Sequence, residues 1–522
     1  MQKKHSTWFS LAAVIFLSNV SCFGLENPVN RWIVKFRNDS SVTLRTHGNP
    51  SQVIHNLKAQ LDKNLKLTRS LSVTQDQDLL WAANAVAITA TDEQIKKIAV
   101  LENVETVLPV TYRKYDFDNP NSETFSMRWP WPWPQPTPEP DSSWGISKVK
   151  APEVWEKYKI DGSGVVVGLI DSGVDAKHVL LAGRVIAFKD FTAAPQTEAY
   201  DDHGHGTHTA GTICASGGIG IAPGANLIAA KGFARDGSYT HEGLLKAMQW
   251  MMDPDGNPDT NDFPGMVSNS WNCDATHEGS DPVEKLFLDV VNNWTSMGIL
   301  SIFAAGNDGP KGKIYVPACF VNTWTVGATK SDDNLAYFSS QGPSVWDVVT
   351  YMKPDISAPG EDIISCARGG GLTKKSGTSM ACPHVTGLTA LMLQANPKLS
   401  ISEIRQIAEE SSVDLGEKGK DKMFGSGRID AFACISRILE TTSFENLISG
   451  YQSALEKEKS LNNNPAVSPL AEPMEHYLIE KAKSLNEAEF NSLMNRYSKD
   501  LVLSGLFKQI KTARKFENIH SH

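Results

Sequence analysis

Three continuous apolar runs lie between residues 142 and 440, and they constrain the fold more than any other feature of the chain. The runs cover residues 165–170, 227–230 and 298–304. A run without alternating polar residues is typical of a strand buried on both faces, as in a parallel sheet covered by helices. Helical patterns at residues 243–251 and 283–296 lie among these runs. We therefore predict an α/β domain over residues 142–440, with a mostly parallel sheet between two layers of helices.

Residues 30–113 predict a separate, small α+β module. Strand patterns at residues 32–36, 85–89 and 104–110 interleave with helical patterns, one at residues 53–61 and one that begins after Thr91. Thr91 and Gln94 have the spacing of a capping box, which marks a helix N-terminus. This order of elements is that of a ferredoxin-like, split βαβ module.

Two further segments flank the α/β domain. Residues 114–141 contain alternating prolines from Pro130 onward, which exclude a helix or a central strand and favour an extended linker. We interpret the linker as a spacer and processing region rather than a docking segment for a partner. Residues 441–522 predict a helical C-terminal extension with a polar break near residues 462–473. The extension can pack on the α/β domain, bind a partner or be removed, and its sequence does not distinguish among these three alternatives.

The chain begins with the pattern of a signal peptide. Lys3 and Lys4 precede an apolar run at residues 8–17, and small residues follow up to Gly24. We expect residues 1–24 to direct export to an extracellular or periplasmic space. Lipid attachment at Cys22 is disfavoured, because Asn19 stands where such signals carry an aliphatic residue.

Composition excludes several classes of protein. The chain has 522 residues, 41% of them hydrophobic, which is enough for large cores. Its net charge of −9 provides no basic excess for binding nucleic acid. No pair of cysteines has C-x-x-C spacing, so a zinc site or a redox motif is not indicated. Six cysteines follow the signal segment, and their pairing stays open, including a possible bridge between Cys273 and Cys319.

Three short motifs carry the residues for nucleophilic catalysis. They are Ile-Asp171-Ser-Gly, His-Gly-His205-Gly-Thr and Gly-Thr-Ser379-Met-Ala. A serine hydroxyl becomes a nucleophile when a base takes its proton, and an imidazole suits this role near neutral pH. A carboxylate then orients the imidazole and stabilises its charged form. Pro383 is tolerated in the first turn of a helix, so we expect a helix to begin near Ser379.

These motifs resemble the three signature motifs of subtilases, the subtilisin-like serine proteases, in the family's order Asp, His, Ser. A fourth motif, Ala-Ala305-Gly306-Asn307, resembles the family's oxyanion-hole segment. The resemblance covers about 300 residues and implies a subtilisin-like three-layer fold. It implies that Asn307 and the backbone N–H of Ser379 stabilise the oxyanion. It also implies that residues 30–113 are a propeptide that assists folding and inhibits the active site.

The resulting prediction is a serine endopeptidase that acts through an acyl-enzyme and is made as a zymogen. Its catalytic residues would be Asp171, His205, Ser379 and Asn307. We expect protein or peptide substrates to bind as an added strand, with an apolar or broad preference, and the chain to be a monomer. The predicted substrate-binding residues are Gly237, Ser238, Asn269, Ser270, Trp271, Ala305 and Gly306.

Several alternatives accompany this prediction. A metal site is conceivable where His203, His205 and His208 lie close together in the sequence. The motif around His205 is, however, accounted for by its role in the triad, and we expect His208 to be structural. We expect Asp175 to be a turn residue and Cys382 an inert buried thiol. Asp202 could tune His205 or substrate selection, but we favour a solvated loop charge. No cofactor is expected for the chemistry, and no metal ligand is assigned. Structural calcium remains possible, for example at Asp332 and Asp333.

Two other classes of function also remain. One is a catalytically silent binding protein, against which the complete triad argues. The other is an esterase, but the context of Ser379 lacks the Gly-x-Ser-x-Gly elbow of α/β-hydrolases.

Overall fold

A computed structural model of the chain describes residues 31–38, 49–68, 77–117, 143–273, 282–311, 313–346 and 349–441, with parts of 448–511. The predicted signal segment lies outside the described residues, as does the predicted linker beyond residue 117. Among the residues that are described, no helix combines the length and apolar character needed to cross a membrane.

The central element is a seven-stranded sheet in which every recorded pairing is parallel. Its strands, in spatial order, are β15 (Ile356–Pro359), β12 (Trp324–Thr329), β11 (Leu300–Ala304), β10 (Met266–Asn269), β6 (Val166–Asp171), β8 (Asn226–Lys231) and β7 (Val185–Asp190). The three apolar runs correspond to β6, β8 and β11, so the predicted parallel sheet is confirmed.

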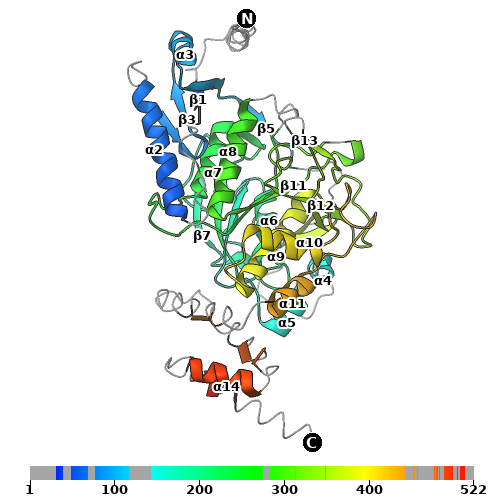
Figure 1. The fold of residues 1–522 in the computed structure, drawn as a ribbon. Coiled ribbons are helices and arrows are strands. Elements are labelled where there is room, and N and C mark those ends of the chain that lie inside the picture. Colours follow the sequence, from blue (N-terminus) through cyan, green and yellow to red (C-terminus); the bar gives the residue numbers. More distant parts are fainter. Residues whose placement is uncertain are drawn as a thin grey trace, which may run out of the picture.

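Helices cover both faces of this sheet (Figure 1). Helices α6 (His205–Cys214) and α9 (Thr378–Ala395) belong to one hydrophobic core, while α7 (His241–Trp250) and α8 (Pro282–Met297) belong to another. Leu169 joins the core with α9, and its neighbour Ile170 joins the core with α8. Successive strand residues point to opposite faces, which explains why the strands are apolar throughout. The three-layer α/β fold is therefore confirmed.

The N-terminal module is a second, antiparallel sheet. Its strand order is β2-β3-β1-β4, and the chain order β-α-β-β-α-β is that of a split βαβ module. Its elements are β1 (Arg31–Phe36), α2 (Pro50–Thr68), β2 (Gln77–Leu80), β3 (Ala85–Thr89), α3 (Asp92–Ala99) and β4 (Val104–Pro109). The capping box predicted at Thr91 is present, because the Thr91 and Gln94 side chains each accept a backbone N–H of the other residue.

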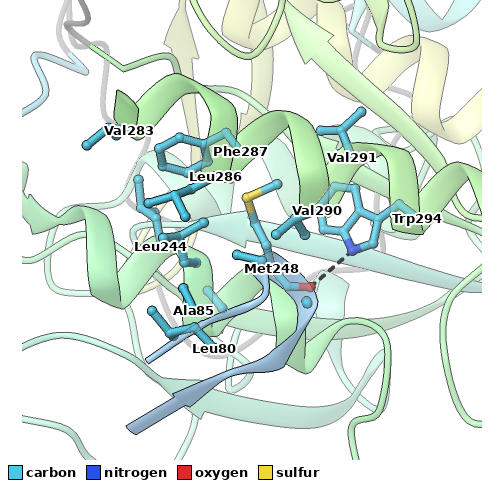
Figure 2. Packing of buried hydrophobic residues seen from close by; sticks show 14 of the residues in the cluster. Leu80, Ala85, Leu244, Met248, Val283, Leu286, Phe287, Val290, Val291 and Trp294 are labelled. Atoms are coloured by element: carbon cyan, nitrogen blue, oxygen red, sulfur yellow. Dashed lines mark hydrogen bonds between the residues drawn. The ribbon is translucent and has the colours of Figure 1, made fainter. Parts of the chain in front are cut away.

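The N-terminal module packs against α7 and α8. Figure 2 shows Leu80 and Ala85 of the module beside Leu244 and Met248 of α7, and they share one core with the buried face of α8. Two polar contacts add to this interface. Asn293 Nδ2 of α8 donates to the carbonyl of Ala82 at 2.7 Å, and Lys35 forms an ion pair with Asp289. The module therefore covers an apolar face that the α/β domain would otherwise expose.

A helical C-terminal region follows α11 (Ala431–Thr441). It includes α14 (Glu487–Arg496), which agrees with the predicted amphipathic pattern around Phe490 and Leu493. The buried residues of this region form a hydrophobic cluster of their own, separate from the two cores of the α/β domain. The predicted helical character of the extension is thus confirmed, and its described buried residues pack with one another.

We expect Leu286→Ala to destabilise the α/β domain strongly. Leu286 lies on α8 and is fully buried. Its truncation to alanine should therefore lower the free energy of unfolding by about 2–5 kcal/mol. Val179, which is 60% exposed, provides the control, and Val179→Ala should cost less than about 0.5 kcal/mol. Denaturant unfolding in a Ser379→Ala background, which prevents self-digestion, measures both. Equal losses in the two variants would contradict the assigned core.

Candidate active site

Asp171 and His205 form a buried hydrogen-bonded pair at the carboxyl edge of the sheet. Asp171 is the last residue of β6 and His205 is the first residue of α6. His205 Nδ1 lies 2.8 Å from Asp171 Oδ1, and the exposed fractions of the two side chains are 1% and 0%. The Ser172 N–H donates to the same Oδ1 at 2.7 Å, and Thr209 Oγ1 donates to Oδ2 at 3.1 Å. These donors fix the carboxylate so that it orients the imidazole.

The loop before His205 is held by a second carboxylate. Asp201 Oδ1 accepts hydrogen bonds from the backbone N–H groups of His203 and Gly204 at 3.0 and 2.8 Å. Its other oxygen accepts from the N–H and hydroxyl of Thr207, in the first turn of α6. Asp201 is 6% exposed, so these bonds replace the water that the carboxylate has lost. The position of His205 is thereby set from both sides.

Ser379 lies in the first turn of α9, after Gly377. Its hydroxyl donates to the carbonyl of Ser270 at 3.2 Å. Among the described residues, the Nε2 atom of His205 has no hydrogen-bond partner. The hydrogen bond between nucleophile and base is therefore not formed in this state, although both residues lie at the same edge of the sheet.

The predicted helix start near Ser379 is confirmed, but the predicted place of Pro383 within that helix is wrong. Helix α9 begins at Thr378, so Pro383 lies in its second turn rather than its first. Proline has no N–H to donate to the carbonyl four residues earlier, which is that of Ser379. The hydroxyl of Ser270 donates to this carbonyl at 2.9 Å and replaces the missing helical bond. Strand β10 is thus tied directly to the turn that carries the nucleophile.

The amide of Asn307 has a defined orientation. Its oxygen accepts from the N–H of Thr378 at 2.9 Å and from the Thr378 hydroxyl at 3.0 Å. The Nδ2 group therefore faces away from Thr378. A Cβ atom placed on Gly377 would lie 3.5 Å from Asn307 Nδ2 and 3.6 Å from the Ser379 nitrogen. Both nitrogens, together with Asn307 Oδ1 at 3.7 Å, therefore lie around one position beside Gly377, which is where the oxyanion hole is predicted.

Gly237 and Ser238 lie beside a strand from the N-terminal region. Strand β5 (Tyr112–Lys114) pairs antiparallel with β9 (Ser238–Thr240), and Ser238 is paired with Lys114. The pairing extends one residue further, because the Tyr115 N–H donates to the carbonyl of Gly237 at 2.9 Å. The edge predicted to bind substrate is therefore occupied by the protein's own chain. The predicted module boundary at residue 113 falls inside β5.

The other predicted substrate-binding residues use their side chains internally. Asn269 Nδ2 donates to the carbonyls of Val267 and Ile302, and the Ser270 hydroxyl donates to Ser379. Trp271 is fully buried among aromatic rings. Ala305 donates its N–H to the carbonyl of Val326, and the Gly306 N–H donates to the Thr378 hydroxyl at 3.1 Å. Any contact of Asn269 or Ser270 with a substrate would therefore come from the backbone.

An aromatic cluster extends from the occupied edge to His205. The ring of Phe117 lies 4.3 Å from that of His205 and 5.0 Å from that of Phe233, centroid to centroid. Tyr115 contacts both phenylalanines, and Phe117 is only 8% exposed. We did not predict these contacts, because residues 112–117 show no strand periodicity. One feature of the sequence could have indicated these contacts, namely the aromatic residues of segment 112–117, which lies before the proline-rich part of the linker.

The described residues also bear on the alternatives. His208 Nε2 donates to the Ile363 carbonyl at 3.0 Å, and burial lowers the pKa of this side chain to about 3, as expected for a structural histidine. Burial raises the pKa of the Cys382 thiol to about 11, which agrees with an inert thiol. Among the described residues, no disulfide joins Cys273 to Cys319. Asp175 accepts backbone N–H groups of Lys177 and Gly369, as a turn residue does.

Acidic residues that can hold a cation gather elsewhere. Within the described part of the chain, one group has suitable spacing, in which Asp253, Asp255 and Asp262 each offer one ligand atom within 4.8 Å of the others. Asp253 also accepts from Lys58 of α2 at 2.6 Å. By contrast, Asp333 pairs with Lys148 and Arg428 and has no need of a cation.

Comparison with known proteins agrees with this geometry. The family model of the subtilase family matches residues 162–427, which include all three motifs. The chain belongs to the subtilase family. Subtilases are serine endopeptidases and need no cofactor for catalysis.

The alignments with individual relatives include different shares of this subtilase and of each relative. It is 31% identical over 435 residues to bacillopeptidase F of Bacillus subtilis, which corresponds to 73% of this chain and 29% of that protein. It is 36% identical to the serine protease AprX of the same organism, over 52% of this chain and 66% of AprX. It is 32% identical to M-protease of Shouchella clausii, over 69% of this chain and 88% of that protein. The chain thus spans less than two thirds of bacillopeptidase F and of AprX.

We expect Ser270 and Pro383 of this subtilase to be energetically coupled. Ser270→Ala should leave the buried carbonyl of Ser379 without a donor and lower the free energy of unfolding by about 1–3 kcal/mol. Pro383→Ala restores the helical N–H, so Ser270→Ala should cost less in that background by about 1 kcal/mol. Denaturant unfolding of the four variants of this cycle, all carrying Ser379→Ala, gives the coupling. Additive effects would show that the Ser270 hydroxyl does not replace the proline's missing donor.

Proposed function

We propose that this protein is a secreted serine endopeptidase that is made as a zymogen and processes itself. Ser379 attacks the peptide carbonyl while His205 takes its proton and later returns it to the leaving amine. Asp171 holds the tautomer and orientation of His205. Asn307 Nδ2 and the Ser379 N–H stabilise the oxyanion. The observation that carries this proposal is the buried Asp171–His205 hydrogen bond beside Ser379, with two N–H donors around Gly377.

The proposal of a zymogen rests on the occupied edge. Residues 112–115 pair with β9 as a substrate strand would, and Phe117 covers the His205 ring. The hydroxyl of Ser379 meanwhile donates to Ser270 rather than to His205. Both features describe a latent site. They support residues 30–113 as a propeptide whose C-terminal end, extended here to Phe117, inhibits the enzyme within the same chain.

Attachment to one chain makes this inhibition effective. A tethered segment competes with free substrate at a high effective concentration. The apolar interface with α7 and α8 fixes the module and so delivers residues 112–117 to the cleft. Cleavage in the segment after Phe117 removes the tether, and the inhibitor can then dissociate or be degraded. Residues 118–141 therefore remain the proposed processing region.

The cleft favours apolar substrates. Near β9, the ring of Phe233 contacts those of Trp271 and Tyr239, and all three residues are buried when Tyr115 and Phe117 are in place. A substrate that replaces residues 112–117 would add a strand to β9 and place alternate side chains on these rings. The proposed substrates are thus extended protein segments with aromatic or large aliphatic side chains.

Export is proposed from the signal pattern at residues 1–24. The absence of a helix suited to membrane crossing among the described residues is compatible with it.

Intact mass of the purified protein tests the proposal most directly. The wild-type chain should lose its N-terminal region through a cut within residues 118–141, while Ser379→Ala, expressed identically, should remain uncut. Cleavage of both proteins at the same bond would assign processing to another protease. Retention of peptide hydrolysis by Ser379→Ala would refute the proposed mechanism outright.

Phe117→Ala should weaken the latent state. Loss of the Phe117–His205 and Phe117–Phe233 contacts should raise the rate at which a fluorophosphonate probe labels Ser379 by about tenfold, since each aromatic pair contributes about 0.5–1.5 kcal/mol. Labelling is measured on the uncut fraction, identified by mass. Tyr112→Ala is the matched control on the same segment, because Tyr112 is 72% exposed. Equal labelling of Phe117→Ala and wild type would show that Phe117 does not protect the site.

A further inference from the structure

Lys231 is a fully buried lysine whose ammonium group contacts Ser172, which follows Asp171, and Asp202, in the loop before His205. It is the last residue of β8 and lies opposite Asp171 in the register of β6 and β8. Its Nζ donates to the carbonyl of Ser172 at 2.6 Å, to Asp202 Oδ1 at 2.6 Å and to the carbonyl of Phe233 at 2.7 Å. An ammonium has three N–H groups, so each of them is used. Burial of this charge is costly unless such bonds are made.

The first of these bonds connects Lys231 to the carboxylate of Asp171 through a single residue, Ser172. The Ser172 carbonyl is held by Lys231, while the Ser172 N–H donates to Asp171 Oδ1 at 2.7 Å. The same Oδ1 accepts the hydrogen bond of His205 Nδ1 at 2.8 Å. The orientation of one residue, Ser172, is therefore fixed by Lys231 on one side and fixes Asp171 on the other.

The second bond leads to the catalytic imidazole. Asp202 is three residues before His205, in the loop that Asp201 ties to α6. The sequence suggested a solvated charge at Asp202, but its carboxylate forms an ion pair with Lys231 and is only 36% exposed. The third bond holds the backbone of Phe233, whose ring receives Phe117. One ammonium group thus joins the segments of the acid, the base and the substrate cleft.

We propose that Lys231 is a positioning residue that holds residues 171–172 and 202–205 in the relative placement required for the Asp171–His205 hydrogen bond. This inference rests on the catalytic roles proposed above. Lys231 does not touch the reacting atoms. Its removal leaves two buried carbonyls and one carboxylate without their donor, so the two segments should shift relative to each other. A displacement of about 1 Å can reduce turnover about 10²-fold.

Lys353 provides a matched control for removing a buried ammonium. It is 1% exposed, and it donates to the Thr323 carbonyl at 2.7 Å and to Asp355 at 2.5 Å. It precedes β15, the strand at the opposite edge of the sheet from β7, and touches none of the proposed catalytic residues. Lys353→Met should therefore lower stability without affecting the triad.

The test compares Lys231→Met with Lys353→Met in the processed enzyme, with active sites counted by fluorophosphonate titration. We expect Lys231→Met to lower kcat about 10²-fold while KM changes less than about threefold, because the interaction acts on chemistry rather than on binding. The downfield proton resonance of the Asp171–His205 hydrogen bond should be lost in Lys231→Met. Lys353→Met should keep both kcat and the resonance, even at an equal loss of Tm.

A second variant covers the case in which Lys231→Met does not fold. Asp202→Ala removes one of the three acceptors at a partly exposed position and should lower kcat about tenfold. Wild-type kcat and resonance in folded Lys231→Met, or wild-type kcat in Asp202→Ala when Lys231→Met does not fold, would overturn the inference. Ser379→Ala in the same assay tests the proposed function separately, because its activity does not depend on Lys231.

Discussion

The buried carboxylate of Asp171 is the constraint on which the arrangement of the site depends. A carboxylate with no exposed surface needs donors that replace water, and the sheet edge supplies three, from His205, Ser172 and Thr209. These donors come from the first turn of α6 and from the residue after β6. The need to satisfy one charge therefore fixes the placement of a helix N-terminus against a strand, and that placement presents His205 Nε2 to the cleft.

The parallel sheet makes this convergence possible, and the sequence predicts it well. Because all strands run in one direction, Asp171, Lys231 and Asn269 end neighbouring strands at one edge. The uninterrupted apolar runs indicate the sheet, and short glycine-containing motifs indicate the residues at its edge. The strands β6, β8 and β11 can be predicted from such local patterns, because burial on two faces leaves few polar positions along each of them.

Contacts between segments that are distant in the sequence could not be predicted from such local patterns. The pairing of β5 with β9 joins residues more than a hundred positions apart, and three exposed residues in β5 carry no periodic signal. Asp202 seemed a solvated charge because its partner, Lys231, ends an apolar strand and has no local connection to it. Pro383 correctly indicated a helix start near Ser379, but its position in the second turn depends on the Ser270 hydroxyl, which replaces the missing donor. In each case the deciding partner belongs to another element.

In the zymogen proposed here, the latent and active states differ by little. The Asp171–His205 pair is formed, and the two donors near Gly377 are in place, while the covered His205 ring and the Ser379–Ser270 hydrogen bond distinguish the latent state. In this proposal, activation requires residues 112–117 to leave the cleft and the Ser379 hydroxyl to rotate, rather than assembly of the site. A site whose dipoles are already oriented reorganises little during the reaction. The inhibitory segment can therefore occupy the cleft while the catalytic geometry forms beneath it.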